Sequence, residues 1–144
     1  MAFDITRKKA LETAKIDLVN GDGSPLYDDD GNVLSVTVHG PGSKVWQQAD
    51  AERNRRRTGR IEKNRGRISA ALDHAREDEV DFLVAVTVSF NGWKYPGPSD
   101  AEDWPSAKDQ FRAAYGDDTI GYIRDHVHKE ATDWSVFTSS SAKS

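Results

Sequence analysis

The sequence predicts an α+β protein that is mainly α-helical, with an N-terminal β-hairpin and a projecting basic helix. Three patterns support this prediction. Two alternating, strand-like segments occur in the first forty residues, a basic segment with helical spacing follows, and apolar residues then recur at near-helical spacing to about residue 137. The chain has 144 residues, of which 36% are hydrophobic and 31% charged. We therefore expect one domain with a modest core over residues 1–138 and a disordered Ser-rich tail over residues 139–144.

The β-hairpin is expected over residues 14–39. Residues 15–19 (KIDLV) alternate polar and apolar side chains, and residues 33–38 (VLSVTV) alternate and are rich in β-branched side chains. Asn, Asp, Gly and Pro dominate the sequence between these two segments, which is typical of turns. The tripeptide at 40–42 (GPG) ends the hairpin.

A basic helix is expected over residues 43–66, with Ser43 as its N-cap and Gly66 at its C-terminus. The segment from residue 53 to residue 67 has a net charge of +7, although the whole chain has a net charge of −4. On a helical wheel, six of its cations share an arc that overlaps the arc of Val45, Trp46 and Ala49. These six are Arg53, Arg56, Arg57, Arg60, Lys63 and Arg67. Since unpaired Arg is rarely buried, we expect a helix that is anchored by its first turns and projects its second half into solvent.

A helical body is expected over residues 68–137. Residues 82–90 (FLVAVTVSF) suit either a buried helix or a strand, and acidic residues just before them favour a helix. A short helix capped by Ser106 is expected to residue 115, with Phe111 and Ala114 facing inward. A last helix is expected from residue 117 through Trp134. Residues 93–100 are expected to form a loop, because two prolines and a glycine prevent regular structure.

The basic segment is the main candidate for partner binding. It can bind the phosphates of a nucleic acid, contact a protein partner or a neighbouring subunit, or be a solvated face that pairs with the acidic remainder of the chain. No aromatic residue lies within the segment, which disfavours base stacking and makes nucleic acid the weaker alternative. Trp93, Tyr95 and Trp104 flank the Pro/Gly loop and are either core residues or an exposed recognition patch.

No sequence motif indicates catalysis, a cofactor or a metal. The chain lacks a nucleophile elbow, a phosphate-binding Gly loop and a zinc-protease motif, and its four histidines have no evident carboxylate or serine partner. Residues 28–32 (DDDGN) do not match an EF-hand, and His126 and His128 are two apart on an expected helix. We therefore expect that the protein is not an enzyme and that it has no cofactor and no metal site. The chain has no cysteine, no signal-peptide-like start and no long apolar run, which favours a reducing compartment and no membrane insertion.

Three local patterns, in this order and spacing, resemble a known family. They are residues 36–45 (VTVHGPGSKV), residues 82–92 (FLVAVTVSFNG), and the ending FRAAY at 111–115, IGYI at 120–123 and DWSVF at 133–137. Together they resemble tail assembly chaperones of long-tailed, non-contractile bacteriophages and prophages. The resemblance covers about residues 33–138.

The resemblance implies a non-catalytic protein that binds the tape measure protein, keeps it soluble and assists assembly of the tail tube. It implies the host bacterial cytoplasm as the location and absence from the mature virion. The tape measure protein is then the expected partner, with the tail tube protein as a second one and self-association through the basic helix as a further contact. The alternatives are a nucleic-acid-binding accessory protein and a structural tail component retained in the particle.

Overall fold

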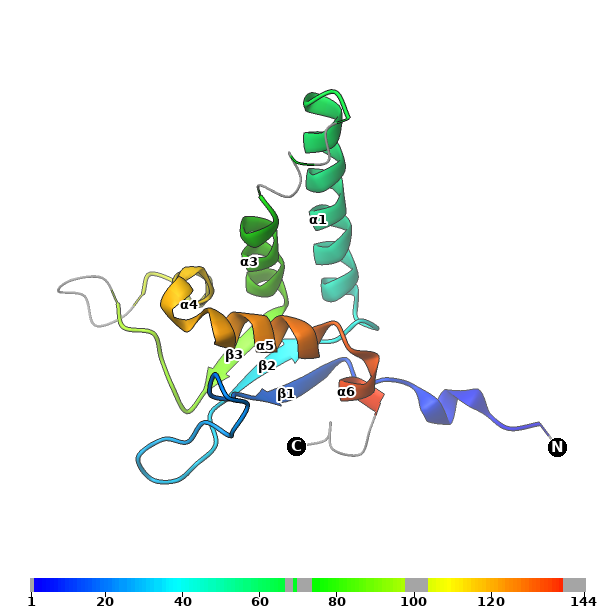
Figure 1. Ribbon diagram of the computed structural model, residues 1–144. Coiled ribbons are helices and arrows are strands. Elements are labelled where there is room, and N and C mark those ends of the chain that lie inside the picture. The colour runs from blue at the N-terminus through cyan, green and yellow to red at the C-terminus, as the bar shows by residue number, and fades with distance from the viewer. Residues whose placement is uncertain (1, 67–68, 70–73, 98–103, 139–144) are drawn as a thin grey trace.

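One antiparallel sheet with the strand order β1-β2-β3 forms the base of the molecule, and helices pack against it (Figure 1). The computed structural model describes residues 2–66, 69, 74–97 and 104–138. Its elements are η1 (Ile5–Lys8), β1 (Thr13–Asp17), β2 (Ser35–His39), α1 (Lys44–Lys63), α3 (Ala75–Val86), β3 (Thr87–Asn91), α4 (Ala107–Gly116), η2 (Asp118–Ile120), α5 (Gly121–Ala131) and α6 (Trp134–Thr138). The predicted class, α+β and mainly helical, is confirmed. The predicted tail over 139–144 lies outside the described residues.

The hairpin is formed by β1 and β2, which pair antiparallel from Thr13 opposite His39 to Asp17 opposite Ser35. β1 starts and ends two residues before the predicted segment, and β2 starts two residues later than predicted. Residues 19 and 33 instead form isolated bridges with residues of the connecting segment. The side chains of β1 alternate between exposed and buried, so one face of the strand is covered and the other is open to solvent.

The basic helix α1 begins as predicted. The Ser43 hydroxyl accepts a hydrogen bond from the Trp46 amide at 3.2 Å, which satisfies one of the free N–H groups of the first turn. Trp46 and Ala49 pack inward, but Val45 is 39% exposed, so the prediction that these three residues share a buried side is wrong for Val45. Figure 1 shows α1 rising from the sheet with α3 beside it.

Residues 80–90 are neither one helix nor one strand, because α3 ends at Val86 and β3 begins at Thr87. The prediction of one continuous central helix is therefore wrong, as is the alternative of one strand. β2 supplies the reason, since Thr87 pairs with Val38 and Phe90 with Val36 along the sheet. The Lys108 ammonium group of α4 donates to the carbonyl oxygens of Val84 at 2.8 Å and Ala85 at 3.4 Å, which satisfies acceptors of the last turn of α3.

The C-terminal part contains more helices than predicted. The helix capped by Ser106 is confirmed as α4, and its predicted inward residues Phe111 and Ala114 are buried. The predicted last helix is divided into η2, α5 and α6. Asp133 accepts a hydrogen bond from the Ser135 amide at 2.9 Å, which caps the start of a separate helix, α6. Trp134 is therefore 55% exposed and does not continue the apolar side of α5.

The core lies between the sheet and the helices. Ile16 and Val36 from the sheet and Phe82 and Leu83 from α3 are buried in one cluster. Burial raises the pKa of the Tyr115 hydroxyl far above its ordinary value, and its oxygen lies 2.7 Å from the Thr87 hydroxyl. Over the described ranges, no helix combines the length and the apolar character needed to cross a membrane.

Candidate protein-interaction surface on α1, α3 and α4

The basic side of α1 faces α3, and Arg53 is its innermost cation. The Arg53 guanidinium carbon lies 4.0 Å from the centroid of the Phe82 ring, which is a cation–π contact. Its two terminal nitrogens lie 2.7 Å from a carboxylate oxygen of Asp50 and 2.9 Å from Nε2 of His128. Arg53 is therefore held by a ring, a carboxylate and an imidazole of its own chain.

Arg56 and Arg60 converge on Asp78 of α3. They are four residues apart, so they lie one above the other on the same side of α1. Asp78 is only 5% exposed and forms an ion pair with Arg60, while Nε of Arg56 lies 3.9 Å from its second oxygen. The hydrogen bond to Asp78 raises the pKa of the Arg60 guanidinium. The buried carboxylate and the two cations thus fasten α1 to the first turn of α3.

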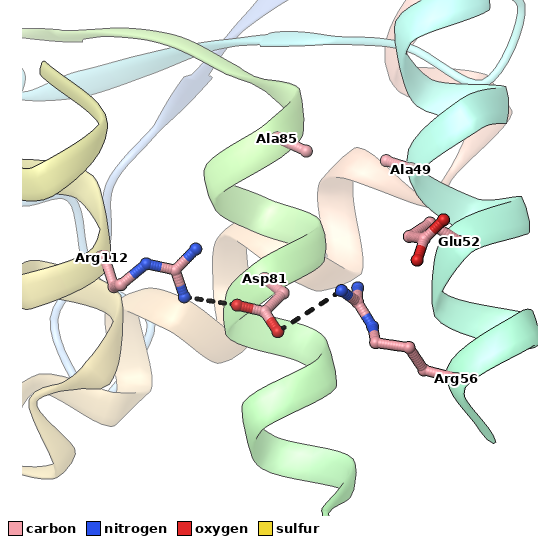
Figure 2. Close-up of a pocket in the computed structure, with 6 residues that line it drawn as sticks. All are labelled: Ala49, Glu52, Arg56, Asp81, Ala85 and Arg112. Atoms are coloured by element: carbon pink, nitrogen blue, oxygen red, sulfur yellow. Dashed lines mark hydrogen bonds and ion pairs between the residues drawn. The ribbon is translucent and has the colours of Figure 1, made fainter. Parts of the chain in front are cut away.

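A groove of about 200 Å³ lies where α1, α3 and α4 meet (Figure 2). Ala49, Glu52 and Arg56 line it from α1, Asp81 and Ala85 from α3, and Arg112 from α4. Arg112 forms an ion pair with one oxygen of Asp81, and Nη1 of Arg56 lies 3.7 Å from the other. The two alanines give the groove small apolar walls, and its rim carries charges of both signs. A small groove with such a rim suits a side chain or a helix of a protein better than a free small molecule, whose pockets are usually larger.

The described cations of the predicted basic surface therefore differ in burial and in ion pairing. Arg53, Arg56 and Arg60 are partly buried and held by ion pairs with carboxylates of the same chain. Arg57 and Lys63 are exposed, and no carboxylate of the described residues lies within 4.0 Å of them. Arg67 lies outside the described residues. The half of α1 that was predicted to project into solvent thus has one side packed on α3, because the sequence provides carboxylates at helical spacing to receive it.

His128 has a carboxylate partner that was not evident from the sequence, as does His74, whose Nδ1 lies 3.2 Å from Glu77. Nδ1 of His128 lies 3.2 Å from Glu79 and its Nε2 lies 2.9 Å from Arg53. Because Arg is only a donor, Nε2 must accept, and the proton of the neutral ring is on Nδ1, facing Glu79. Burial lowers the pKa of His128 and the charge of Arg53 lowers it further, against the opposing effects of Glu79 and Asp125.

The aromatic residues around the Pro/Gly loop are partly buried and use their polar atoms within the fold. The Trp93 indole donates to the Ser35 carbonyl at 2.9 Å, and its ring stacks on Phe90 at a centroid distance of 3.9 Å. The Tyr95 hydroxyl donates to Asp117 at 2.7 Å, and the Trp104 indole donates to the Tyr95 carbonyl at 3.0 Å. The hydrogen bond of its hydroxyl to Asp117 raises the pKa of Tyr95. These bonds fix the described residues on either side of the loop to the body, and none of the three residues lines the groove between α1, α3 and α4.

The acidic segment at residues 28–32 (DDDGN) forms local hydrogen bonds. One carboxylate oxygen of Asp28 accepts from the amides of Asp30 and Asn32, each at 2.9 Å, and these bonds lower the pKa of Asp28. His126 and His128 diverge, since Nε2 of His126 lies 3.0 Å from the Asp17 carbonyl oxygen. Within the described ranges, no three acidic, histidine or cysteine side chains are grouped so that they could hold a metal ion.

The site also contains residues that the sequence analysis did not select. Asp78, Glu79 and Asp81 were assigned only to the start of a helix, and Arg112 only to one of the family-like patterns. Asp78 and Asp81 pair with cations of α1, Arg112 lines the groove, and Glu79 pairs with His128, which contacts Arg53. The spacing of Asp78, Asp81 and Ala85 on one side of α3 is the signal that could have revealed them. The comparisons add no further guide, because no protein-family model, curated protein or solved structure matches this chain.

Proposed function

We propose that this protein is a non-catalytic tail assembly chaperone of long-tailed, non-contractile bacteriophages or prophages. It binds the tape measure protein, with the tail tube protein as a second partner, in the host cytoplasm, and it leaves before the virion is complete. The three sequence patterns that resemble this family support the class of function. The mixed-charge surface on α1, α3 and α4, together with the exposed cations Arg57 and Lys63 of α1, is the observation that supports protein binding.

The ion pairs of α1 favour a protein partner over nucleic acid. Three of the six predicted cations already have partners in their own chain. A phosphate backbone would have to compete with the buried carboxylate of Asp78 for two of them. A protein surface with charges of both signs can pair with the rim of the groove without displacing these contacts.

Co-expression with the tape measure protein of the same phage or prophage tests the proposal. We expect the tape measure protein to be soluble and to copurify with this chain, and to aggregate without it. The variant Arg57→Glu/Lys63→Glu should weaken copurification, because it reverses the exposed charges and breaks no ion pair of the described residues. The matched control Lys15→Glu/Lys94→Glu reverses two exposed cations elsewhere and should bind as the wild type does.

Two outcomes would overturn the proposal. One is a tape measure protein that is equally soluble and uncomplexed with and without this chain. The other is detection of the chain by mass spectrometry in purified virions at the stoichiometry of a structural protein, which would identify it as a tail component.

A further inference from the structure

Residues 2–9 leave the body as an arm, visible in Figure 1 beside α6. Every residue of this arm is exposed, including Phe3 at 58% and Ile5 at 73%. The arm nevertheless has local order, because Asp4 accepts hydrogen bonds from the Thr6 amide at 3.0 Å and the Thr6 hydroxyl at 2.7 Å at the start of η1. Two large apolar side chains are thus held in water on a short, ordered segment, which is typical of a binding surface.

The arm also differs in charge from the rest of the molecule. Arg7, Lys8 and Lys9 against Asp4 give it a net charge of +2, so the remainder of the chain, whose total is −4, has a net charge of −6. The body of a second copy therefore attracts the arm.

A pocket of about 410 Å³ lies at the root of the arm. Its lining residues are Glu12, Thr13, His39, Gly42, Ser43, Lys44 and Val45. The Trp134 ring lies beside Gly42, and both Val45 and Trp134 are exposed. More of the pocket surface is apolar than polar, and its lining carries one carboxylate, Glu12, and one ammonium group, Lys44. No residue of the arm of the same chain lines it.

We propose that two copies of this protein exchange their arms, so that Phe3 and Ile5 of each copy enter the pocket beside the start of α1 in the other. Because the pocket adjoins the root of the arm, one two-fold axis near Glu12 allows both exchanges at once and closes the assembly as a dimer. An arm of this length, partly in η1, reaches about 20 Å, which is enough to cross such an axis. This inference does not depend on the proposed chaperone function.

Sedimentation equilibrium of the full chain over a range of concentrations tests the exchange. The wild type should dimerise, and Phe3→Ser/Ile5→Ser should raise the dimer dissociation constant about 100-fold or more, because each substitution acts twice in a closed dimer. The control Tyr27→Ser removes an equally exposed aromatic side chain far from the arm in sequence and should leave the constant unchanged. A wild type that stays monomeric up to about 1 mM, or a dimer that survives Phe3→Ser/Ile5→Ser, overturns the proposal.

Disulfide trapping locates the contact, since the chain has no cysteine of its own. A mixture of the single variants Phe3→Cys and Val45→Cys should form a covalent heterodimer under mild oxidation. A mixture of Phe3→Cys and Tyr27→Cys should form far less. Equal yields from the two mixtures would show that the arm does not occupy the pocket, and would overturn the proposal even if the wild type dimerises.

Discussion

At the scale of single residues, Asp78 is the carboxylate on which the basic side of α1 depends most. It is almost fully buried and contacts both Arg56 and Arg60. The variant Asp78→Asn keeps the shape but removes the charge, so partly buried Arg60 loses its carboxylate partner and Arg56 keeps only Asp81. We expect the free energy of unfolding, measured by urea denaturation, to fall by about 2 kcal/mol.

The matched control for Asp78 is Glu52→Gln. Glu52 lies on α1, where it is exposed at the groove and pairs with the exposed Arg55 three residues further along. Screening by water makes such an exposed pair contribute little, so Glu52→Gln should lower the free energy of unfolding far less than Asp78→Asn does. Equal losses for the two variants would contradict the assignment of Asp78 as the anchor of α1.

His128 makes the stability depend on pH near neutrality. Its pKa in the folded protein is lowered from the ordinary value of 6.5 by burial and by Arg53, against the effects of Glu79 and Asp125. Between the lowered pKa and 6.5, the unfolded chain binds a proton that the folded chain does not. The contribution of His128 to stability is therefore fully present above about pH 6.5 and is lost as the pH falls through the folded pKa.

Urea denaturation between about pH 7 and pH 5 measures this effect. The wild type should lose stability as the pH falls, and His128→Gln should lose less over the same range. His39 also has a lowered pKa, mainly because of burial, so the comparison is best made in a His39→Gln background. An unchanged pH dependence after His128→Gln would contradict the assigned tautomer and its contact with Arg53.

At the scale of secondary-structure elements, the two glycines of the α1 segment have opposite roles. Gly59 lies inside the helix, and a Cβ there would meet nothing within 4 Å. Gly66 follows the helix with a φ of +81°, and its amide donates to the Ile61 carbonyl at 2.7 Å, as in a Schellman motif. The helix therefore ends at Lys63, and its termination extends over Asn64, Arg65 and Gly66.

The same substitution should consequently have opposite signs at these two sites. Gly59→Ala should raise the free energy of unfolding by about 0.5–1 kcal/mol, because alanine loses less backbone entropy in a helix. Gly66→Ala should lower it by about 1 kcal/mol, because an L side chain is strained at positive φ. Thermal unfolding followed by circular dichroism measures both, and a Tm shift of the same sign for both variants would contradict the assigned end of α1.

The elements that could be predicted from the sequence are those specified by local signals. α1 and α4 begin where Ser43 and Ser106 cap them, because a cap acts on its own first turn. The change from α3 to β3 was not predictable, since it depends on pairing with β2, about fifty residues earlier in the chain. The helical wheel placed Arg53, Arg56 and Arg60 on one side of α1, but only tertiary packing shows that α3 covers that side and leaves Arg57 and Lys63 exposed.

At the scale of the whole molecule, two kinds of interface hold the helices. Near the sheet, Trp46 meets Phe82 edge-on at a centroid distance of 5.4 Å, and the contacts are apolar. Farther from the sheet, α1 and α3 are joined by the ion pairs of Arg56 and Arg60 with Asp78 and Asp81. The stability of the pair of helices should therefore decrease with distance from the sheet, because partly exposed ion pairs contribute less than buried apolar contacts.

Salt should reveal this gradient. Raising NaCl from about 50 mM to about 1 M shortens the screening length from roughly 14 Å to about 3 Å, which weakens the partly exposed ion pairs and leaves the apolar core intact. In hydrogen exchange followed by mass spectrometry, amides of α1 beyond Arg53 and of the first turns of α3 should exchange several-fold faster at high salt. Amides of β2, which is paired on both sides, serve as the internal control and should not change. A uniform change across α1, α3 and β2 would mean that the ion pairs do not limit local opening, and that α1 is held along its whole length by the same core as the sheet.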